Sequence, residues 1–360
     1  MAIDTVKLDA FMAKMVGEMG AAINASLILL GDKLGLYKAM AHAGAMTPMQ
    51  LAKKTSTSER YVREWLNAQA AGGIVAYDAP ANGNGAGGTY TLPDEQAMAL
   101  ADEGSPAFLC GAYQVIEAVM KDVPKVERAF KTGAGLGWHE HDAGLFHGTE
   151  RFFRPGYAAH LVGEWIPALR GVKEKLERGA AVADVGCGHG ASTILMAQAF
   201  PKSSFYGYDY HAASIFAARH AAEEAGVADR VEFQVCPAKK FPRQGEGYDL
   251  VTFFDCLHDM GDPVGAARHV KESLRAGGTW MVVEPIAGDA VQDNLTPVGR
   301  IFYCASTVVC MPASVAQEVG AALGAQAGEG RLREVFRDAG FTQVRRAAET
   351  PFNMVLEVKG

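Results

Sequence analysis

Hydrophobic residues in the first seventy positions recur with a helical period. Apolar side chains are spaced three or four residues apart over residues 4–43, which predicts helix. Thr47 followed by Pro48 predicts the start of a second helix, because a Thr side chain caps a helix and Pro suits its first turn. Residues 58–71 have the pattern of a third helix.

A short alternating pattern follows these helices. It predicts one strand over residues 74–77 and another over residues 89–92. Residues 79–88 between them are rich in Gly and Asn, so we expect a mobile loop tip. Helices followed by a two-stranded wing are typical of a winged-helix module, which we assign to residues 1–104.

Residues 105–170 are mostly helical in pattern and connect this module to the rest, with a Gly-rich insert at 133–148 that we expect to act as a lid. In residues 171–360 short apolar runs alternate with helical segments. That alternation predicts an α/β domain with a mainly parallel, doubly wound sheet of the Rossmann-like type. The expected strands and helices are 182–185, 191–199, 204–208, 212–225, 231–235, 250–254, 263–275 and 279–283.

Composition narrows the function classes. The 360 residues are 49% hydrophobic and 21% charged, as in a globular protein, and the net charge is −7. An acidic chain is a poor candidate for non-specific nucleic-acid binding. None of the six cysteines forms a CxxC pair, so we expect reduced thiols in a cytoplasmic protein. No signal peptide is visible, and the apolar run 21–30 is too short for a membrane span.

The strongest motif is a buried strand that runs into a glycine-rich turn, VADVGCGHG at residues 182–190. Glycines let the backbone turn tightly beside a ligand, and the helix that follows offers free N–H groups. Asp184, two residues before the first glycine, is suited to the ammonium group of an amino-acid ligand. Asp209 ends the next strand, where a carboxylate can accept both hydroxyls of a ribose.

This half of the chain resembles the class I S-adenosylmethionine-dependent methyltransferases, and the stretches YDLV (248–251) and LRAGGT (274–279) agree. The usual acidic residue after the third strand is missing from CPAK (236–239), so the adenine contact is expected from backbone near Ala238. The resemblance implies that S-adenosylmethionine is held by Asp184, Gly186, Cys187, Gly188, Gly190, Asp209, Tyr210, Ala238 and Asp255.

The segment FDCLHDMGDP (254–263) resembles the His-Asp-Trp segment of small-molecule O-methyltransferases of the caffeate type, with Met260 where Trp is usual. The resemblance implies that His258 is the general base and that Glu284 orients it. A second flanking Glu matches only loosely, to Gln326 or Glu329. The stretch GTERF (148–152) is also similar, and the family's winged-helix domains form dimers, so we expect a homodimer.

The acceptor is expected to be a small molecule that carries a hydroxyl or a thiol. A His of pKa ~6.5 must take a proton from a phenol of pKa ~10 or from a thiol of pKa ~8.5, an uphill step of ~5 or ~2.7 kcal/mol. The pattern does not separate these two. Residues expected to line the acceptor site are Trp138, His139, His141, Phe153, Tyr157 and Tyr303.

Two alternatives remain open. The segment WHEHD (138–142), with His147 nearby, has ligands for a metal, but we favour a polar cap over the active site and assign no metal. The second alternative is a transcriptional regulator that senses S-adenosylmethionine and binds DNA through Lys53, Lys54, Arg60 and Arg63. The acidic net charge disfavours this reading.

Overall fold

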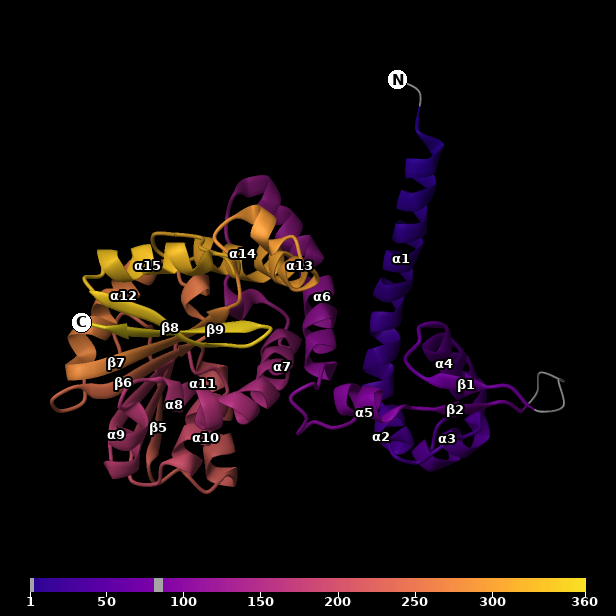
Figure 1. The fold of residues 1–360 in the computed structure, drawn as a ribbon, viewed down its shortest axis with the longest axis horizontal. Coiled ribbons are helices and arrows are strands. Elements are labelled where there is room, and N and C mark those ends of the chain that lie inside the picture. Colours follow the sequence, from indigo (N-terminus) through magenta and orange to yellow (C-terminus); the bar gives the residue numbers. More distant parts are fainter. Residues whose placement is uncertain (1–2, 81–86) are drawn as a thin grey trace. The chain divides into compact units, whose positions relative to one another are not determined.

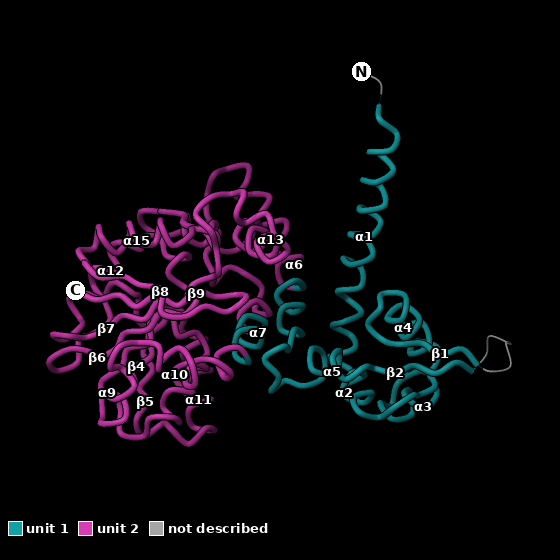
Figure 2. The backbone as a smooth tube through the Cα atoms, viewed as in Figure 1, with its two compact units in different colours: residues 1–117, 147–155 teal, residues 118–146, 156–360 magenta. Residues whose placement is uncertain are grey.

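The computed structural model describes residues 3–80 and 87–360, and contacts divide the chain into two compact units (Figure 2). Unit 1 comprises Met1–Glu117 and His147–Pro155, and unit 2 comprises Ala118–Phe146 and Gly156–Gly360. The segment 105–170 thus falls partly in each unit. The domain boundaries expected after residues 104 and 170 stay a prediction.

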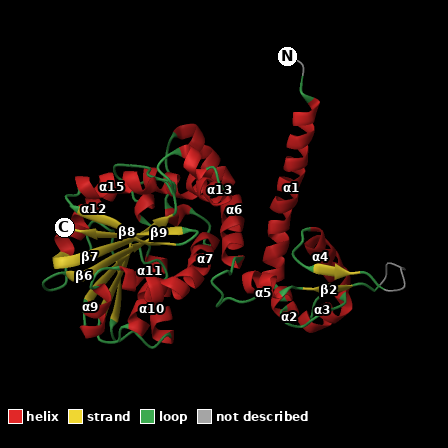
Figure 3. Cartoon of the chain, in the orientation of Figure 1, coloured by secondary structure: helices red, strands yellow, loops and turns green. Residues whose placement is uncertain are grey.

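Unit 1 has the helices and wing that the sequence predicts (Figure 3). Its elements are α1 (Thr5–Lys33), α2 (Leu36–Met40), α3 (Pro48–Thr55), α4 (Glu59–Ala71), β1 (Ala76–Asp78), β2 (Thr89–Thr91) and α5 (Asp94–Leu100). Thr47 caps α3 in a capping box with Gln50, which confirms the predicted helix start. Strands β1 and β2 pair antiparallel, and the mobile tip expected at 79–88 lies mostly outside the described residues.

Two long helices, α6 (Cys110–Thr132) and α7 (Gly144–His160), correct the expected extent of the glycine-rich insert. We expected irregular chain as far as residue 148, but Gly144 and Gly148 are helical. A Cβ on Gly148 would lie 2.7 Å from the backbone N of Val115, so this glycine allows α7 to pack closely on α6. The irregular part is therefore residues 133–143, with one 3₁₀ turn at Trp138–Glu140.

Unit 2 contains a seven-stranded sheet in the order β5-β4-β3-β6-β7-β9-β8 (Figure 1). Strands β3 to β7 are parallel, and β9 and β8 add antiparallel at one edge. The sequence pattern did not predict this C-terminal pair. The strands are β3 (Ala181–Val185), β4 (Ser204–Asp209), β5 (Val231–Val235), β6 (Tyr248–Phe254), β7 (Leu274–Pro285), β8 (Gln343–Glu349) and β9 (Asn353–Lys359).

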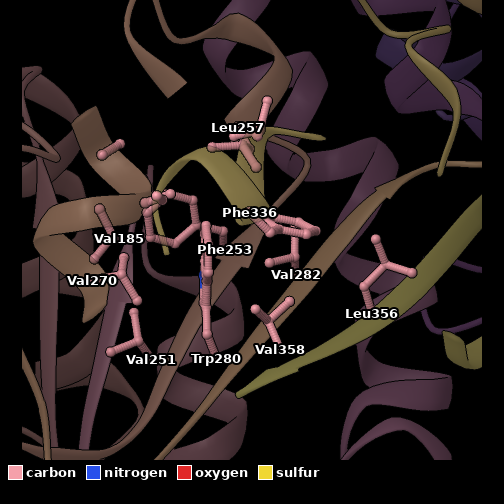
Figure 4. Packing of buried hydrophobic residues seen from close by; sticks show 14 of the residues in the cluster. Val185, Val251, Phe253, Leu257, Val270, Trp280, Val282, Phe336, Leu356 and Val358 are labelled. Atoms are coloured by element: carbon pink, nitrogen blue, oxygen red, sulfur yellow. The ribbon is translucent and has the colours of Figure 1, made fainter. Parts of the chain in front are cut away.

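Helices cover both faces of this sheet, as a doubly wound fold requires. The α-helices from residue 166 onward are α8 (Ile166–Ala168), α9 (Val172–Arg178), α10 (Ala191–Ala199), α11 (Ala212–Glu224), α12 (Pro263–Ser273), α13 (Pro297–Ala305), α14 (Met311–Val315) and α15 (Gly328–Asp338). On one face α12 and α15 enclose the main core, where Val270 and Phe336 pack on Phe253, Trp280 and Leu356 (Figure 4). Helices α9, α10 and α11 lie on the other face (Figure 1).

Among the described residues, two helical segments are long and apolar enough to cross a membrane by length and composition, Thr5–Lys33 and Pro297–Val315. Nearly half of the second segment's apolar window is buried inside unit 2. The first has Lys14 and Glu18 near its middle, and charged side chains are costly at the centre of a membrane span. Neither segment therefore indicates a membrane protein.

Candidate active site

The glycine-rich turn joins β3 to α10 at the carboxyl edge of the parallel strands. Gly186, Gly188 and Gly190 all have positive φ, at 74°, 51° and 81°, a conformation that favours glycine. A Cβ would lie 2.7 Å from Cys256 Sγ at Gly186 and 2.6 Å from the Phe233 ring at Gly190. At Gly188 it would meet nothing within 4 Å. Gly186 and Gly190 are thus packing glycines, whereas Gly188 borders open space.

The two aspartates of this edge differ in their surroundings. Both oxygens of Asp184 are buried and accept hydrogen bonds from hydroxyls, Oδ2 from Ser192 at 2.7 Å and Thr193 at 2.6 Å, and Oδ1 from Thr252 at 2.9 Å. Asp184 therefore fixes the start of α10 against β6. Asp209 is partly exposed and accepts from the backbone N–H groups of Gly188 and His211, at 3.0 and 2.8 Å.

Three other residues expected near the cofactor lie at the same edge with different exposure. Tyr210 follows Asp209 and is nearly half exposed. Cys187 is buried, and a Cβ on Gly207 of β4 would lie 3.1 Å from its Sγ, so the thiol packs into the fold. Ala238 is partly buried against the main core. Contact of these residues with a ligand stays a prediction.

Asp255 is the last of the expected cofactor residues. It follows β6 with a positive φ of 49° and accepts hydrogen bonds from Tyr157 Oη at 2.8 Å and Asn353 Nδ2 at 2.7 Å. Burial and the nearby charge of Glu284 raise the pKa of Asp255 to about 7. Both of its oxygens are thus engaged within unit 2.

His258 and Glu284 lie together, as the sequence suggested. His258 is on a 3₁₀ turn (Leu257–Asp259) after β6, and Glu284 is near the end of the neighbouring strand β7. His258 Nδ1 lies 2.5 Å from Glu284 Oε2, and both side chains are buried. Burial disfavours the charged imidazolium, but the carboxylates of Glu284 and Asp259 outweigh this effect and raise the pKa of His258 well above its usual value.

The second carboxylate beside His258 is Asp259, which sequence reasoning missed. His258 Nε2 lies 3.3 Å from Asp259 Oδ1, and Cys310 contributes a buried thiol to the same place. The two earlier candidates have other partners. Glu329 pairs with Arg333 and Arg346, and Gln326 Nε2 donates to the backbone oxygens of Ile286 and Ala325.

The insert, which we define as residues 133–143, reaches this cluster. The indole N–H of Trp138 donates to Asp259 Oδ2 at 2.8 Å, and the backbone N–H of Leu136 donates to the carbonyl of Pro312. His139 meets the ring of Tyr210 edge-on, with ring centroids 6.3 Å apart. Trp138 and His139 therefore connect the base with the cofactor edge of the sheet. Motion of the insert stays a prediction.

The contact of the remaining four expected acceptor-site residues with an acceptor stays a prediction, and their described surroundings differ. His141 is buried and its Nδ1 lies 2.9 Å from Asp122 Oδ2 on α6. Tyr157 packs on Phe254 and bonds to Asp255. Tyr303 lies on α13, and Phe153 belongs to unit 1. Of the six, only Trp138 bonds directly to a residue next to His258 among the described contacts.

The sheet order, the glycine turn and the acidic residue at the end of β4 define a class I methyltransferase fold. Models of two families match the chain, a methyltransferase domain over residues 176–340 and an Rv2258c-like winged HTH domain over residues 21–102. The chain therefore has a class I S-adenosylmethionine-dependent methyltransferase domain behind an N-terminal winged-helix domain, as the sequence predicted. S-adenosylmethionine is the cofactor of this domain.

Known proteins of similar sequence match about a third of the chain. The 27-O-demethylrifamycin SV methyltransferase of Amycolatopsis mediterranei (strain S699) is 29% identical over 131 residues, 35% of this chain and 48% of that protein. The dimethylglycine N-methyltransferase of Parasynechococcus marenigrum (strain WH8102) is 23% identical over 130 residues, 36% of this chain and 46% of that protein. The chain thus spans about half the length of these curated relatives.

Solved structures match nearly the whole chain. Mitomycin 7-O-methyltransferase has a TM-score of 0.68 at 17% identity, with 99% of this chain and 100% of that one covered. Human N-acetylserotonin methyltransferase, solved with S-adenosylmethionine, has a TM-score of 0.68 at 14% identity, with 97% of each chain covered. At such low identity these likenesses establish the fold.

The residues at the sheet edge fit the cofactor. Each oxygen of Asp209 accepts one backbone N–H in the hydrogen bonds given above, which leaves a second lone pair on each for a ribose hydroxyl. Gly188 leaves open space beside this carboxylate. Asp184 fits less directly, because a ligand ammonium would compete with three hydroxyl donors.

Proposed function

We propose that the protein transfers a methyl group from S-adenosylmethionine to a hydroxyl or thiol of a small molecule, with His258 as the general base. The observation that carries this proposal is the hydrogen bond between His258 Nδ1 and Glu284 Oε2. It fixes the ring so that Nε2 is the nitrogen available for proton transfer. His258 also follows a parallel strand at the edge where ligands of open α/β sheets bind.

Bound S-adenosylmethionine supplies a methyl group that is already activated by a positively charged sulfur. The protein must then hold the two reactants in line and remove the acceptor's proton. We assign binding of the ribose to Asp209. Gly188 allows the backbone to come close to the cofactor, and Tyr210 lies next to Asp209 in the chain. Trp138 and His139 of the insert are suited to cover the reacting groups and exclude water.

The electrostatic environment of His258 suits it to a hydroxyl acceptor. Its pKa is raised by Glu284 and Asp259, which narrows the gap to a phenol of pKa ~10. Proton transfer then costs less than the ~5 kcal/mol expected for a His of pKa ~6.5. A thiol loses its proton more readily than a phenol and needs a weaker base. The raised pKa of His258 therefore favours an acceptor that is methylated on oxygen. Mitomycin 7-O-methyltransferase, compared above, is an O-methyltransferase by name, which agrees with oxygen, whereas the dimethylglycine relative is an N-methyltransferase by name.

The alternative is a transcriptional regulator that senses S-adenosylmethionine, and the winged-helix match is the observation that supports it. Helix α4 would have to supply cations for DNA phosphates. Its two arginines pair with acids of the same helix, Arg60 with Glu64 and Arg63 with Glu59. These pairs reduce the charge that α4 offers to a phosphate, so we favour the enzyme.

We further propose that the protein is cytoplasmic and forms a homodimer through α1. Apolar side chains form an exposed stripe along this helix, which includes Phe11, Met12, Met15, Val16, Met19 and Ile23. A stripe of this length is unfavourable in water and suits a second apolar helix.

The decisive experiment is an acceptor screen with phenols and simple thiols that measures formation of S-adenosylhomocysteine. His258→Ala should lower turnover on the best acceptor roughly 10²–10⁴-fold and leave cofactor affinity nearly intact. His220→Ala, which changes an exposed His on α11, is the matched control and should keep full turnover. Wild-type turnover in His258→Ala would refute the base. DNA binding by gel shift without methyl transfer would favour the regulator.

A further inference from the structure

His258, Asp259 and Cys310 form a buried cluster of three different metal-ligand types. Their donor atoms all lie within 4.8 Å of one another, and within residues 3–80 and 87–360 this is the one such group of three. His258 and Asp259 come from the turn after β6. Cys310 comes from a distant segment, where a π-helical turn (Ser306–Cys310) joins α13 to α14. Single π-turns inside helices are frequent at functional sites.

The donor atoms are arranged as ligands of one small cation. Glu284 contacts His258 Nδ1. This contact fixes the ring, so that Nε2 is the nitrogen on the side of the cluster. This carboxylate–His arrangement is the usual outer support of a metal-bound His. Nε2 lies 3.3 Å from Asp259 Oδ1, close to the separation of two tetrahedral ligands with bonds of about 2.0–2.2 Å. Asp259 Oδ1 is buried beside Nε2, while the other carboxylate oxygen, Oδ2, accepts the indole N–H of Trp138.

The charge balance of the cluster also favours a cation. Three carboxyl groups, Asp255, Asp259 and Glu284, are close enough to act on one another or on His258. Apart from His258, the polar groups described next to these carboxyl groups are neutral. They are Tyr157, Asn353, Trp138, Cys310 and the backbone N–H of Leu257. A bound cation would balance these negative charges.

We propose that His258 Nε2, Asp259 Oδ1 and Cys310 Sγ bind one divalent transition-metal ion of the zinc type. Binding releases the thiol proton of Cys310 and any proton on Nε2 to solvent, so the metal replaces protons and no electrons move. Because the bound Nε2 cannot accept a proton, the ion inhibits methyl transfer reversibly; this consequence rests on the function proposed above.

The test uses cobalt as a probe, because a thiolate bound to cobalt gives a charge-transfer absorption that needs no enzymatic turnover. Metal-free protein should bind one cobalt ion with this absorption, and zinc should displace it. Cys310→Ser should remove the absorption, and Glu284→Gln should weaken binding about 10–100-fold. Cys304→Ser is the matched control, since Cys304 is exposed on the neighbouring helix and should not matter.

Asp259→Asn is a second ligand variant and should also weaken cobalt binding; thermal unfolding checks that each variant is folded. Absence of a thiolate–cobalt band in the wild type, or an equal band in Cys310→Ser, would overturn the metal site. Zinc that binds but leaves turnover unchanged would overturn the inhibition. Methyl transfer in the presence of a chelator tests the proposed function separately, so its failure is distinguishable from failure of the metal site.

Discussion

The carboxylate of Glu284 contacts both the ring of His258 and the backbone N–H of the residue before it. Its Oε2 lies 2.5 Å from His258 Nδ1, while its Oε1 accepts the backbone N–H of Leu257 at 2.9 Å. One carboxylate therefore fixes both the ring of His258 and the backbone just before it. The same carboxylate raises the pKa of His258 against the opposing effect of burial.

Glu284→Gln should shift the pH profile of turnover. A general base works in its neutral form, so wild-type turnover should rise with pH as His258 loses its proton, with an apparent pKa above ~6.5. Gln keeps the shape but removes the larger of the two carboxylate charges that raise the pKa of His258, so this pKa should fall. The rising limb should move to lower pH, and the plateau should fall because the base is weaker.

The measurement is turnover against pH for both proteins at saturating cofactor. Glu329→Gln is the control, because Glu329 pairs with Arg333 and Arg346 instead of His258. A rising limb at the same pH in wild type and Glu284→Gln would mean that His258 is not the group that titrates.

The sequence predicted the parallel part of the sheet well because each signal was local. The mostly apolar segment 182–185, which contains Asp184, and the glycines after it predict a buried strand and a turn from local sequence alone. Strands β8 and β9 were missed because β8 is only partly buried and its sequence, QVRRAAE, lacks a clear alternating pattern. Its position depends on antiparallel pairing with β9.

The candidate site was predicted in part for the same reason. His258 and Glu284 end neighbouring parallel strands, so the order of elements alone brings them together. Asp259 lies inside the motif that contains His258, but sequence reasoning assigned it no role. Its contacts with His258 Nε2 and with the indole of Trp138 depend on the folded structure, and residue spacing does not predict them. Cys310 reaches the cluster through a π-helical turn, a deviation that no periodic pattern signals.

Asp209→Ala should weaken binding of S-adenosylmethionine. The variant loses two charge-assisted hydrogen bonds to the ribose, each worth on the order of 1.5–3 kcal/mol before compensation. We expect an affinity loss of at least about tenfold by calorimetry. Asp229→Ala removes an exposed carboxylate on the loop before β5 and serves as the control. Equal affinity in all three proteins would remove Asp209 from the site.

Asp255→Asn should flatten the pH dependence of stability. In the folded protein the pKa of Asp255 is raised to about 7, whereas an unfolded chain has ~3.9. The folded state thus keeps a proton that the unfolded state has released, so this group's contribution to stability falls as pH rises between those two values. Asn cannot titrate and tolerates the positive φ at this position.

Denaturant unfolding at pH 5, 6 and 7 measures this effect. The free energy of unfolding of the wild type should fall relative to Asp255→Asn by up to about 2–3 kcal/mol between pH 5 and 7. Asp338→Asn, at an exposed position on α15, should follow the wild type. Parallel curves for wild type and Asp255→Asn would show that Asp255 ionises normally.

The double variant Met19→Lys, Ile23→Lys should separate a dimer into monomers. Both side chains are more than half exposed on α1 and lie one helical turn apart, so two lysines put charges at the centre of the proposed interface. Light scattering at micromolar concentration should give twice the chain mass for the wild type and the single mass for the variant. Phe216→Lys, at an apolar position that is 75% exposed on α11, should leave the dimer intact. A monomeric wild type would refute assembly through α1, whereas a dimeric double variant would place the interface elsewhere.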